Sequence, residues 1–587
     1  MISEQKGDLT SIFQKHWFWS AFHQNWWTYG QIILAAIMIN IFSLGSSIFI
    51  MTVYDRVIPN NAVDSLIALS IGMLIVVGFD FLLKYLRAYF IDMAGQKVDL
   101  QVAKSIFDRI LKLKLSRQKG STGKLVNTVR EFESLRDFCT SATLATVVDL
   151  PFIVLFILVI AMIGGNVAWV PAVAVPIVLF VGFVIQPFLS RFSKQAMQEG
   201  GSKQATLVEM VSGLETLKTI GSEKIFHDRW ETAVENHSKV SLSSRMFSQV
   251  AVNCAASAQQ LVQVGIVCVG FLQIMNGDMS IGALIACVII AGRALAPLGQ
   301  LATLLTRYNQ AKSAYIALDE LMAEDHEDVS GRDFIKRANI KGKLDFKNVT
   351  FKYPDQTLKV LDDVSFTLNA GEKLGVLGKI GSGKSTILRL AAGLYEPDEG
   401  AVLIDDTDIR QIFPDDLRQS MSVVLQDILL FSGSIKENIA MGRDSISDED
   451  ILHAAKVSGV QDFLGSMPNG YDVQLRDRGE GLSGGQKQAL ALARALVNQA
   501  PIMLMDEPSS SMDTHSEMKL ISRLKEELKD NTVIVITHRS SMLALVDKII
   551  VIDQGKIVAQ GPKDDVLKFL SSGKVPTANQ VKNNEKA

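Results

Sequence analysis

GKIGSGKST, residues 378–386, is the stretch that decides the fold of the second half of this chain. Its glycines permit a tight turn whose backbone N–H groups can surround phosphate oxygens, and Lys384 and Ser385 suit the terminal phosphates and Mg²⁺. A short apolar strand is predicted at residues 373–377, and a helix is predicted to begin at Ser385. A phosphate-binding loop requires this order of strand, glycine turn and helix. The sequence therefore predicts an α/β domain that binds a nucleotide.

Two carboxylates follow a later predicted strand. The apolar run 502–505 ends in Asp506 and Glu507. In a nucleotide site Asp506 can hold the Mg²⁺ shell, and Glu507 can polarise a water towards the γ phosphate. A further strand at 533–536 is soon followed by His538, which we expect to contact the γ phosphate. These residues predict a site that hydrolyses its nucleotide.

Three more elements complete the predicted site. Gln426 follows a predicted strand at 423–425 and is suited to bind Mg²⁺ or the attacking water, although by itself it would be an ordinary loop residue. Tyr353 is suited to stack on adenine, whereas an isolated aromatic residue is more often packing. LSGGQ, residues 482–486, offers backbone N–H groups and the Ser483 hydroxyl at the start of a helix, where a γ phosphate can bind.

Together these pieces resemble the ATP-binding cassette of ABC transporters over residues 342–565. In that family two cassettes face each other, and the signature of one closes over the ATP held by the other. This chain has one copy of each motif, so the resemblance implies a homodimer with two shared sites and with ATP and Mg²⁺ as cofactors. The implied catalytic residues are Glu507 and His538, and the implied metal residues are Ser385, Gln426 and Asp506. The implied nucleotide contacts are Tyr353, Gly378, Lys379, Ile380, Gly381, Ser382, Gly383, Lys384, Ser385, Thr386, Gln426, Ser483, Gly484, Gly485, Gln486 and Asp513.

Long apolar stretches fill the first half of the chain. Hydrophobic residues make up 48% of the sequence, which is high for a soluble ATPase. The excess lies in six stretches that are poor in charge, each near the about 20 residues that cross a bilayer as a helix. They are residues 32–51, 65–83, 142–163, 167–189, 250–275 and 281–305. The alternative is six buried helices of a soluble protein, and those would need amphipathic partners to cover them.

Charge in the connecting segments predicts the orientation of the spans. Segments 87–136 and 191–245 are rich in Lys and Arg, while the turns at 164–166 and 276–278 contain neither. By the positive-inside rule, the basic segments and both termini are cytoplasmic. The net charge of −3 implies no general affinity for nucleic acid. The four cysteines include no CxxC pair and indicate neither a zinc site nor a disulfide framework.

The sequence predicts a membrane all-α exporter domain followed by an α/β domain with a phosphate-binding loop. The expected parts are an N-terminal interfacial segment at 1–25, a six-span domain at 26–323, a linker at 324–341, the cassette at 342–570 and a polar tail at 571–587. Helical periodicity at 96–115 and 203–220 predicts that spans extend into the cytoplasm. We expect these extensions to end in turns near 116–123 and 221–222, where they can touch a soluble domain.

Three ionisable residues lie in or near the predicted spans. They are Asp80, Lys84 and Asp149. Buried charge in a membrane is costly and often functional, so these residues are expected to line a pathway or to form pairs. For Lys84 the alternative is snorkelling at a helix end, and for Asp149 an inward-facing position is favoured.

Two segments of the membrane half resemble the type I secretion exporters, which move large adhesins or RTX-type toxins out of Gram-negative bacteria. They are VYDRVIPNNA at 53–62 and REFESLRDF at 130–138. The resemblance covers residues 16–565 and implies a secreted protein substrate, a periplasmic membrane-fusion adaptor, an outer-membrane channel and a location in the bacterial inner membrane, among membrane lipid. Many such exporters have an N-terminal peptidase-like domain. Because residues 1–25 alone precede the first span, we expect that domain to be absent here.

Two other functions stay open on these grounds. A lipid or drug exporter would share every ATPase residue, and a membrane protein gated by ATP without useful hydrolysis would share most of them. The segments 53–62 and 130–138 argue against the lipid or drug exporter. Glu507 and His538 argue against the non-hydrolysing protein.

Overall fold

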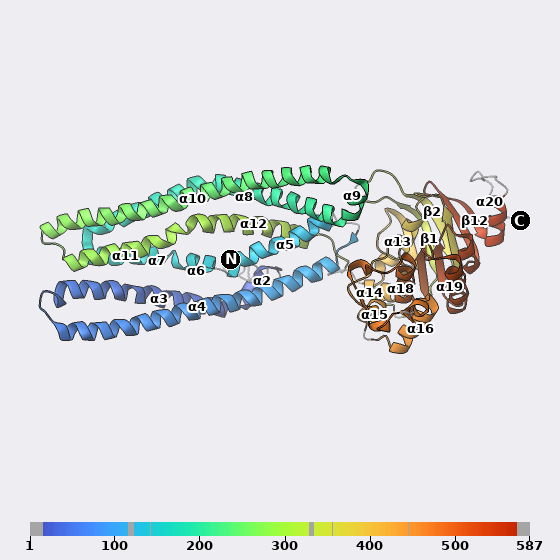
Figure 1. The fold of residues 1–587 in the computed structure, drawn as a ribbon, viewed down its shortest axis with the longest axis horizontal. Helices are drawn as coiled ribbons and strands as arrows, with labels where there is room; N and C mark the ends of the chain where they lie inside the picture. The colour runs from blue at the N-terminus through green and yellow to red at the C-terminus, as the bar shows by residue number, and fades with distance from the viewer. Residues whose placement is uncertain are drawn as a thin grey trace, which may run out of the picture. The chain divides into compact units, whose positions relative to one another are not determined.

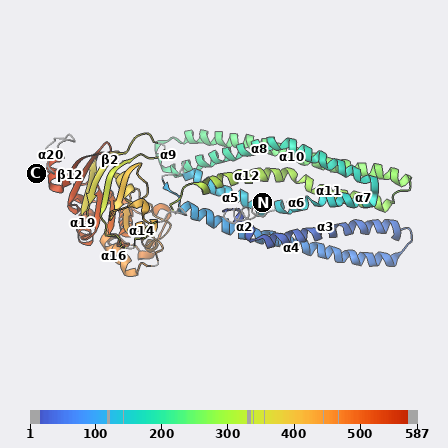
Figure 2. The same ribbon diagram turned by 180° about the vertical axis from the view of Figure 1, so that it is seen from behind.

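The computed structural model describes residues 16–115, 122–140, 142–327, 334–337, 339–354, 356–443, 445–465 and 467–571. Its contacts divide the chain into two compact units, which Figure 1 shows from one side and Figure 2 from behind. The first unit contains Met1–Leu111 and Lys119–Glu324. The second contains Lys112–Gln118 and Asp325–Ala587.

The first unit is helical, and its longest helices run side by side (Figure 1). Helix α10 has 53 residues and α4 has 49, more than twice the about 20 that cross a bilayer. The helices are α2 (Trp19–Gln24), α3 (Trp26–Thr52), the π-helix η1 (Val53–Val57), α4 (Val63–Leu111), α5 (Thr122–Thr140), α6 (Ala142–Asp149), α7 (Phe152–Gly164), the 3₁₀-helix η3 (Gly165–Ala168), α8 (Trp169–Ser212), α9 (Leu214–Ile220), α10 (Glu223–Met275), α11 (Ile281–Gly299) and α12 (Leu301–Ala323).

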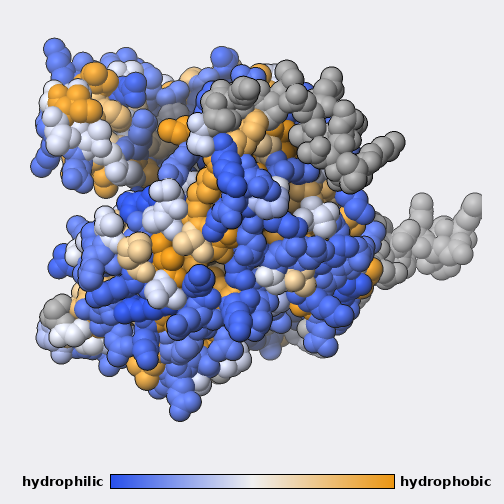
Figure 3. Space-filling view, turned by 90° about the vertical axis from the view of Figure 1, so that its right-hand side faces the viewer, coloured by the Kyte–Doolittle hydropathy of each residue, from blue (hydrophilic) through white to orange (hydrophobic). Residues whose placement is uncertain are grey.

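Apolar side chains cover much of the outside of the first unit. Leu74 is 71% exposed, Phe81 is 73% exposed and Phe183 is 77% exposed. Large exposed apolar surfaces mark interaction with a membrane or with another protein. The second unit instead presents a largely hydrophilic face in Figure 3. This contrast is the one expected of a membrane domain joined to a water-soluble domain.

Within the described residues, five helical runs are long and apolar enough to cross a membrane. They are Trp26–Val57, Val63–Leu111, Ala145–Ser212, Glu223–Met275 and Ile281–Ala323. The six spans stay a prediction, because one of these five runs, Ala145–Ser212, has 68 residues. The expected stretches 142–163 and 167–189 fall in one continuous run, because the turn between them is itself helical.

The run Ala145–Ser212 nevertheless passes twice through the unit. Thr146 donates a hydrogen bond to Gln300 at 2.7 Å, and Gln186 donates one to Asn309 at 3.2 Å. Thr146 and Gln186 lie on opposite sides of the turn at Gly165, and both therefore lie beside the segment 300–309. The chain reverses at Gly165, whose φ of +54° is in the left-handed region that favours glycine.

The structure describes the turn that ends one predicted cytoplasmic extension, and little of the turn that ends the other. Helix α4 continues to Leu111, and most of the expected turn at 116–123 lies outside the described residues. Before it, Lys114 Nζ donates a hydrogen bond to Glu396 Oε1 at 2.7 Å within the second unit. The turn at Gly221 is confirmed by a φ of +68°, which ends α9.

The second unit is built on a six-stranded sheet with the order β12-β11-β3-β10-β9-β6. Strands β11, β3, β10, β9 and β6 are parallel neighbours, and β12 pairs antiparallel with β11. A four-stranded antiparallel sheet, β2-β1-β4-β5, and the short pair β7-β8 accompany it. The strands are β1 (Leu344–Phe351), β2 (Leu361–Leu368), β3 (Lys373–Gly378), β4 (Glu399–Ile404), β5 (Thr407–Asp408), β6 (Met421–Val424), β7 (Gly433–Ser434), β8 (Gln474–Leu475), β9 (Ile502–Asp506), β10 (Thr532–Ile536), β11 (Lys548–Asp553) and β12 (Lys556–Pro562).

Helices of the second unit cover the sheet, because both faces of a parallel sheet must be buried. Strands β9 and β10 are buried along their whole length. The helices are α13 (Lys384–Ala391), α14 (Pro414–Gln419), α15 (Ile435–Ala440), α16 (Asp448–Ser458), α17 (Val460–Leu464), α18 (Gly484–Leu496), α19 (Thr514–Glu527) and α20 (Lys563–Ser571).

The described part of the expected linker packs against the cassette. Ile335 forms a parallel β-bridge with Ile412, and the Arg337 N–H donates to Asp416 at 3.0 Å. The Lys341 N–H donates to Asp405 at 2.6 Å. The cassette thus satisfies backbone groups of Ile335, Arg337 and Lys341, and the bounds of the linker at 324–341 stay a prediction. Residues 1–15 and 572–587, which make up most of the expected terminal segments, lie outside the described residues.

A carboxylate ties the end of the first span to the beginning of α11. Asp55 in η1 accepts the Ser280 hydroxyl at 2.5 Å and the Gly282 N–H at 2.8 Å. Ser280 is also the N-cap of α11, because its hydroxyl accepts the Ala283 N–H. A Cβ on Gly282 would lie 2.5 Å from the Met51 carbonyl oxygen and 2.6 Å from the Asp55 carboxylate.

We expect Gly282→Ala to lower the free energy of unfolding by about 1–3 kcal/mol, because the added methyl group must displace backbone. The measurement is thermal unfolding of the purified protein in detergent. Gly72→Ala in α4 is the matched control, since a Cβ there meets nothing within 4 Å. Equal melting temperatures for the two variants would show that the close approach at Gly282 is unimportant.

Candidate functional site

Four neighbouring parallel strands deliver the predicted site residues to one edge of the sheet. The loop 379–383 follows β3, His538 follows β10, Glu507 follows β9 and Gln426 follows β6. The carboxyl ends of parallel strands meet at one edge, and open α/β sheets bind ligands there. The fold therefore brings together residues that are far apart in the sequence.

The phosphate loop is held in a shape that requires glycine. Gly381 and Gly383 have φ values of +78° and +104°, in the left-handed region. A Cβ on Gly378 would lie 2.2 Å from the Ile552 carbonyl oxygen, and one on Gly383 would lie 2.7 Å from the Val360 carbonyl oxygen. Helix α13 begins at the end of this loop, where the N–H groups of its first turn and its dipole attract phosphate.

Lys384, Ser385 and Asp506 lie at the beginning of α13 and the end of β9. Lys384 is 93% buried as a residue, and its ammonium group donates to the carbonyl oxygens of Gly378 and Lys379 at 2.9 and 2.8 Å. Burial lowers the pKa of Lys384, while the nearby carboxylates of Glu507 and Asp506 oppose this shift. Burial raises the pKa of Asp506, and a hydrogen bond from Ser385 opposes that shift. The site thus holds groups of opposite charge with little water around them.

The donor set at this edge fits Mg²⁺. The Ser385 hydroxyl and the Asp506 carboxylate are in hydrogen-bond contact, and Gln426 offers an amide oxygen from the end of the neighbouring strand β6. Mg²⁺ prefers such oxygen ligands and keeps several waters of its own. A cation here would also offset the cost of burying Asp506.

Glu507 has the geometry of a residue held under strain. Its φ of +51° is in the left-handed region, which costs a non-glycine residue about 1–3 kcal/mol. Its N–H donates to the Ile536 carbonyl at 2.9 Å, and its Oε1 is buried without a hydrogen-bond partner, 3.7 Å from His538 Nε2. Burial raises the pKa of Glu507, and His538 opposes the shift. A buried, unpaired carboxylate oxygen is suited to accept a hydrogen bond from an attacking water.

Tyr353 is fixed by the first turns of α13. Its hydroxyl lies 3.1 Å from Thr386 Oγ1 and accepts from Arg389 at 2.9 Å. Its ring packs edge-on against Tyr395, with 5.3 Å between the ring centroids. The ring is half-buried beside the phosphate loop, and its stacking on adenine stays a prediction. Lys379 and Ile380 are exposed at the tip of the loop.

The signature begins α18 with a capping box. The Ser483 hydroxyl accepts the Gln486 N–H at 3.3 Å, and the Gln486 side chain accepts the Ser483 N–H at 2.9 Å. Ser483 and Gly484 are exposed, so the Ser483 hydroxyl and the Gly484 N–H can face another molecule. Asp513 caps α19 by accepting the N–H groups of His515 and Ser516, each at 3.0 Å. A role of Asp513 in nucleotide binding stays a prediction.

Three residues that were not predicted from the sequence position Glu507 and the turn that follows it. Gln488 in α18 is 97% buried and donates to the Glu507 carbonyl at 3.1 Å and to the Ser510 hydroxyl at 2.6 Å. Arg539 and Glu517 form an ion pair at 3.0 Å, and Arg539 also donates to two carbonyl oxygens of the turn at 509–512. The available signal was a glutamine on the apolar face of α18, where a polar side chain needs partners.

These features define a P-loop ATPase. The description "ABC transporter transmembrane region" matches residues 29–295, and the description "ABC transporter" matches residues 361–510. The chain belongs to the ABC transporters. It is a multi-pass membrane protein that binds ATP and couples ATP hydrolysis to transport.

Several relatives of known function are similar along most of the chain. The exotoxin translocation ATP-binding protein PaxB of Pasteurella aerogenes is 31% identical over 538 residues, which are 92% of this chain and 75% of the relative. The toxin RTX-I translocation ATP-binding protein of Actinobacillus pleuropneumoniae and the leukotoxin translocation ATP-binding protein LktB of Mannheimia haemolytica are also 31% identical, over 92% of this chain and 76% of each relative.

A solved structure is similar in fold to this chain. It is described as a bacterial Atm1-family ABC exporter with ATP bound. It is 26% identical to this chain and has a TM-score of 0.82, over 94% of this chain and 99% of its own. Both units of the chain therefore follow an exporter fold.

Charged residues of the membrane unit form pairs around a cavity of about 540 Å³. Arg87 donates to both oxygens of Asp149 at 3.0 and 3.1 Å, and Lys84 donates to Asp80 at 2.6 Å. Arg293 donates to the Ser43 carbonyl. The expectation that these ionisable groups pair is met, and the pairing keeps the cost of their burial low.

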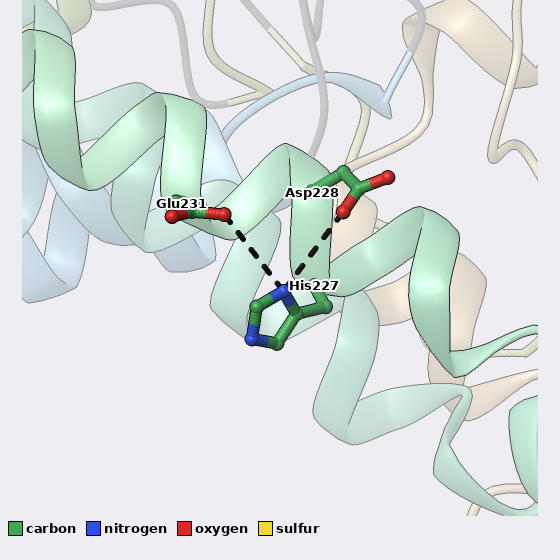
Figure 4. A group of neighbouring side chains, drawn as sticks. All are labelled: His227, Asp228 and Glu231. Atoms are coloured by element: carbon green, nitrogen blue, oxygen red, sulfur yellow. Dashed lines mark ion pairs between the residues drawn. The ribbon is translucent and has the colours of Figure 1, made fainter.

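A second polar group lies on the surface of α10. His227, Asp228 and Glu231 gather there, with the His227 ring nitrogen 3.9 Å from one carboxylate and 4.0 Å from the other (Figure 4). All three side chains are exposed. Exposed pairs of this kind contribute little to stability, and we assign this group to the solvated face of the helix.

We expect Gln488→Leu to lower the ATPase rate by about tenfold to a hundredfold while ATP still binds, because Glu507 and the following turn lose hydrogen bonds each worth about 1–2 kcal/mol. Steady-state phosphate release and equilibrium binding of a fluorescent ATP analogue measure the two effects. Gln560→Leu on the exposed side of β12 is the matched control. An unchanged ATPase rate in Gln488→Leu would contradict the positioning role.

Proposed function

We propose that this chain is the ATP-driven motor of a type I secretion system that exports a protein of the RTX adhesin or toxin class. The observation that carries the proposal is the 31% identity, over 92% of the chain, to proteins named for toxin translocation. The segments 53–62 and 130–138 of the membrane half support it. A lipid or drug exporter would use the same ATP site, so the proposal depends on the membrane half.

The site supports a mechanism in which Glu507 activates water and Lys384 neutralises phosphate charge. In this proposal Ser385, Asp506 and Gln426 hold Mg²⁺, which supplies charge stabilisation at the β and γ phosphates. Tyr353 stacks on adenine, and the loop residues Gly378–Thr386 surround the phosphates. His538 contacts the γ phosphate and also lies beside Glu507. His538 opposes the rise in the pKa of Glu507 that burial causes.

We further propose that two copies of the chain share two ATP sites. Exposure of Ser483 and Gly484 at the beginning of α18 leaves the Ser483 hydroxyl and the Gly484 N–H available to the γ phosphate of ATP on a second copy. Gly485, Gln486 and Asp513 belong to the same face of the proposed dimer. ATP then joins the two cassettes, and hydrolysis releases them.

The proposed location is the bacterial inner membrane, with the cassette and both termini in the cytoplasm. The excess of Lys and Arg in 87–136 and 191–245 supports this orientation. Export across two membranes requires a periplasmic membrane-fusion adaptor and an outer-membrane channel. Both are proposed partners of the membrane unit.

The proposal predicts that deletion of the gene removes at least one large protein from the cell surface or culture fluid, compared by mass spectrometry. The wild-type chain should restore that protein. Glu507→Gln should not, because it keeps ATP binding and dimer closure but cannot activate water. Loss of a lipid or of drug resistance without loss of any secreted protein would favour the alternative exporter. Normal secretion with Glu507→Gln would contradict the assigned role of Glu507.

Shared sites predict that Ser483→Arg abolishes ATPase activity and ATP-induced dimerisation, although ATP still binds to the phosphate loop of each copy. Ser447→Arg is the matched control, because Ser447 caps α16 with the same kind of capping box. Both variants lose an N-cap worth about 1 kcal/mol, so a difference in activity reports the second copy. Size-exclusion chromatography and ATPase assays measure both effects. If Ser483→Arg kept normal activity, the shared site would be wrong.

A further inference from the structure

The loop after β1 contains Tyr353, whose side chain is held by several neighbours at once. Its hydroxyl accepts a hydrogen bond from Arg389 at 2.9 Å and lies 3.1 Å from Thr386 Oγ1. Its ring packs edge-on with Phe351 and with Tyr395, at 5.1 and 5.3 Å between the ring centroids. Such edge-on contacts are favourable between aromatic rings. A phenol ring that is held at its hydroxyl and packed against two other rings has little freedom to rotate.

The backbone of Tyr353 is restricted as well. Pro354 follows it, and a residue that precedes proline is biased towards extended conformations. The Gln356 N–H donates to the Tyr353 carbonyl at 3.1 Å, which closes a turn directly after the ring. Because the backbone has few alternatives here, the direction of the ring depends on the groups that contact the side chain.

Arg389 contacts Tyr353 from the helix that begins at the phosphate loop. In α13, Thr386 and Arg389 are three positions apart, so they share one face of the helix. The guanidinium carbon is 5.9 Å from the centroid of the Tyr353 ring, at the limit of a cation–π contact. Among the described residues Arg389 forms no ion pair, and its guanidinium group donates to Tyr353. The position of the ring is thus tied to the helix that we expect to bind phosphate.

The contacts leave part of the Tyr353 side chain accessible, because Tyr353 and Arg389 are both only half-buried. Stacking of a base on an aromatic side chain raises affinity by about fivefold to a hundredfold. Ordering a side chain on binding lowers affinity by about threefold to tenfold. A ring that is already held in place avoids this loss, so the groups that hold Tyr353 influence how tightly a base binds.

We propose that Arg389 is a positioning residue that holds Tyr353 in place to stack on the adenine base of ATP. The inference rests on the proposed function, in which Tyr353 stacks on adenine, and it adds the residue that places the ring. Arg389 acts through the Tyr353 hydroxyl and contacts neither the base nor the phosphates. Its effect therefore falls on binding of the base and leaves the chemical step unchanged, which is a change in KM without a change in kcat.

A second route from Arg389 to the site leads through Asp506. Burial raises the pKa of Asp506, and the charge of Arg389 is among the influences that oppose this rise. If Arg389 acted through Asp506, its loss would weaken the binding of Mg²⁺ and phosphate whether or not the ligand contains a base. A ligand that has the phosphates but no base therefore separates the two routes.

The first experiment measures ATP hydrolysis by the purified full-length protein, with inorganic tripolyphosphate as a competitive inhibitor that has no base. We expect Arg389→Met to raise the KM for ATP by about threefold to tenfold, because the ring must then be ordered on binding. The kcat and the inhibition constant of tripolyphosphate should stay within about twofold of the wild-type values. Arg389→Lys should restore part of the affinity for ATP, since its ammonium group can also donate to the Tyr353 hydroxyl.

The second experiment tests whether Arg389 acts through the hydroxyl. Tyr353→Phe keeps the ring and loses the hydroxyl, so it should raise the KM for ATP as Arg389→Met does. The double variant of Tyr353→Phe with Arg389→Met should have no larger effect, because both changes break the same contact. Arg523→Met is the matched control, since Arg523 is a half-buried arginine on α19 that donates to Asp462 at 3.0 Å. It should leave the KM for ATP unchanged.

Equal rises in the KM for ATP and in the inhibition constant of tripolyphosphate would overturn the inference, because they would place the effect at the phosphates. Additive effects of Tyr353→Phe and Arg389→Met would also overturn it, as would an equal effect of Arg523→Met. If Tyr353→Leu leaves the KM for ATP unchanged, the stacking in the proposed function fails. If Tyr353→Leu raises that KM by about fivefold or more but Arg389→Met does not raise it, this inference alone fails.

Discussion

Burial of opposite charges beside the phosphate loop is the constraint on which the cassette depends. Asp506 and Glu507 end a strand that is buried along its length, and Lys384 lies next to them in the first turn of α13. Such groups are costly to bury unless they compensate one another or meet a charged ligand. A nucleotide with its cation supplies both kinds of charge. Binding of ATP therefore offsets the cost of burying these groups, and this favours the bound state.

The same region contains a residue with a strained backbone, and other contacts of the cassette must offset the energy of that strain. Glu507 is left-handed at φ +51°, and hydrogen bonds to its N–H and C=O groups from β10 and from Gln488 hold it there. Gln488 belongs to the helix that the signature begins, so Ser483 and Glu507 are linked through one helix and one hydrogen-bonded side chain.

The membrane unit follows a different rule, because much of its exterior is apolar. Arg87 pairs with Asp149, and Asp55 binds the first turn of α11, so ionised groups keep partners where water is scarce. This pairing lowers the cost of placing charged groups among apolar helices.

The sequence by itself determined the phosphate loop, the hydrolytic carboxylates, the apolar stretches and the class of fold, because each depends on local spacing or on a run of similar residues. Tertiary structure alone decided that the residues after β3, β6, β9 and β10 share one edge, because strand order is set by long-range pairing. It also decided that Gln488 holds Glu507, that residues 335–341 pack on the cassette, and that two expected spans form one helical run. Arg245 of α10 and Arg307 of α12 are far apart in the sequence, and only helix packing brings them to one cavity.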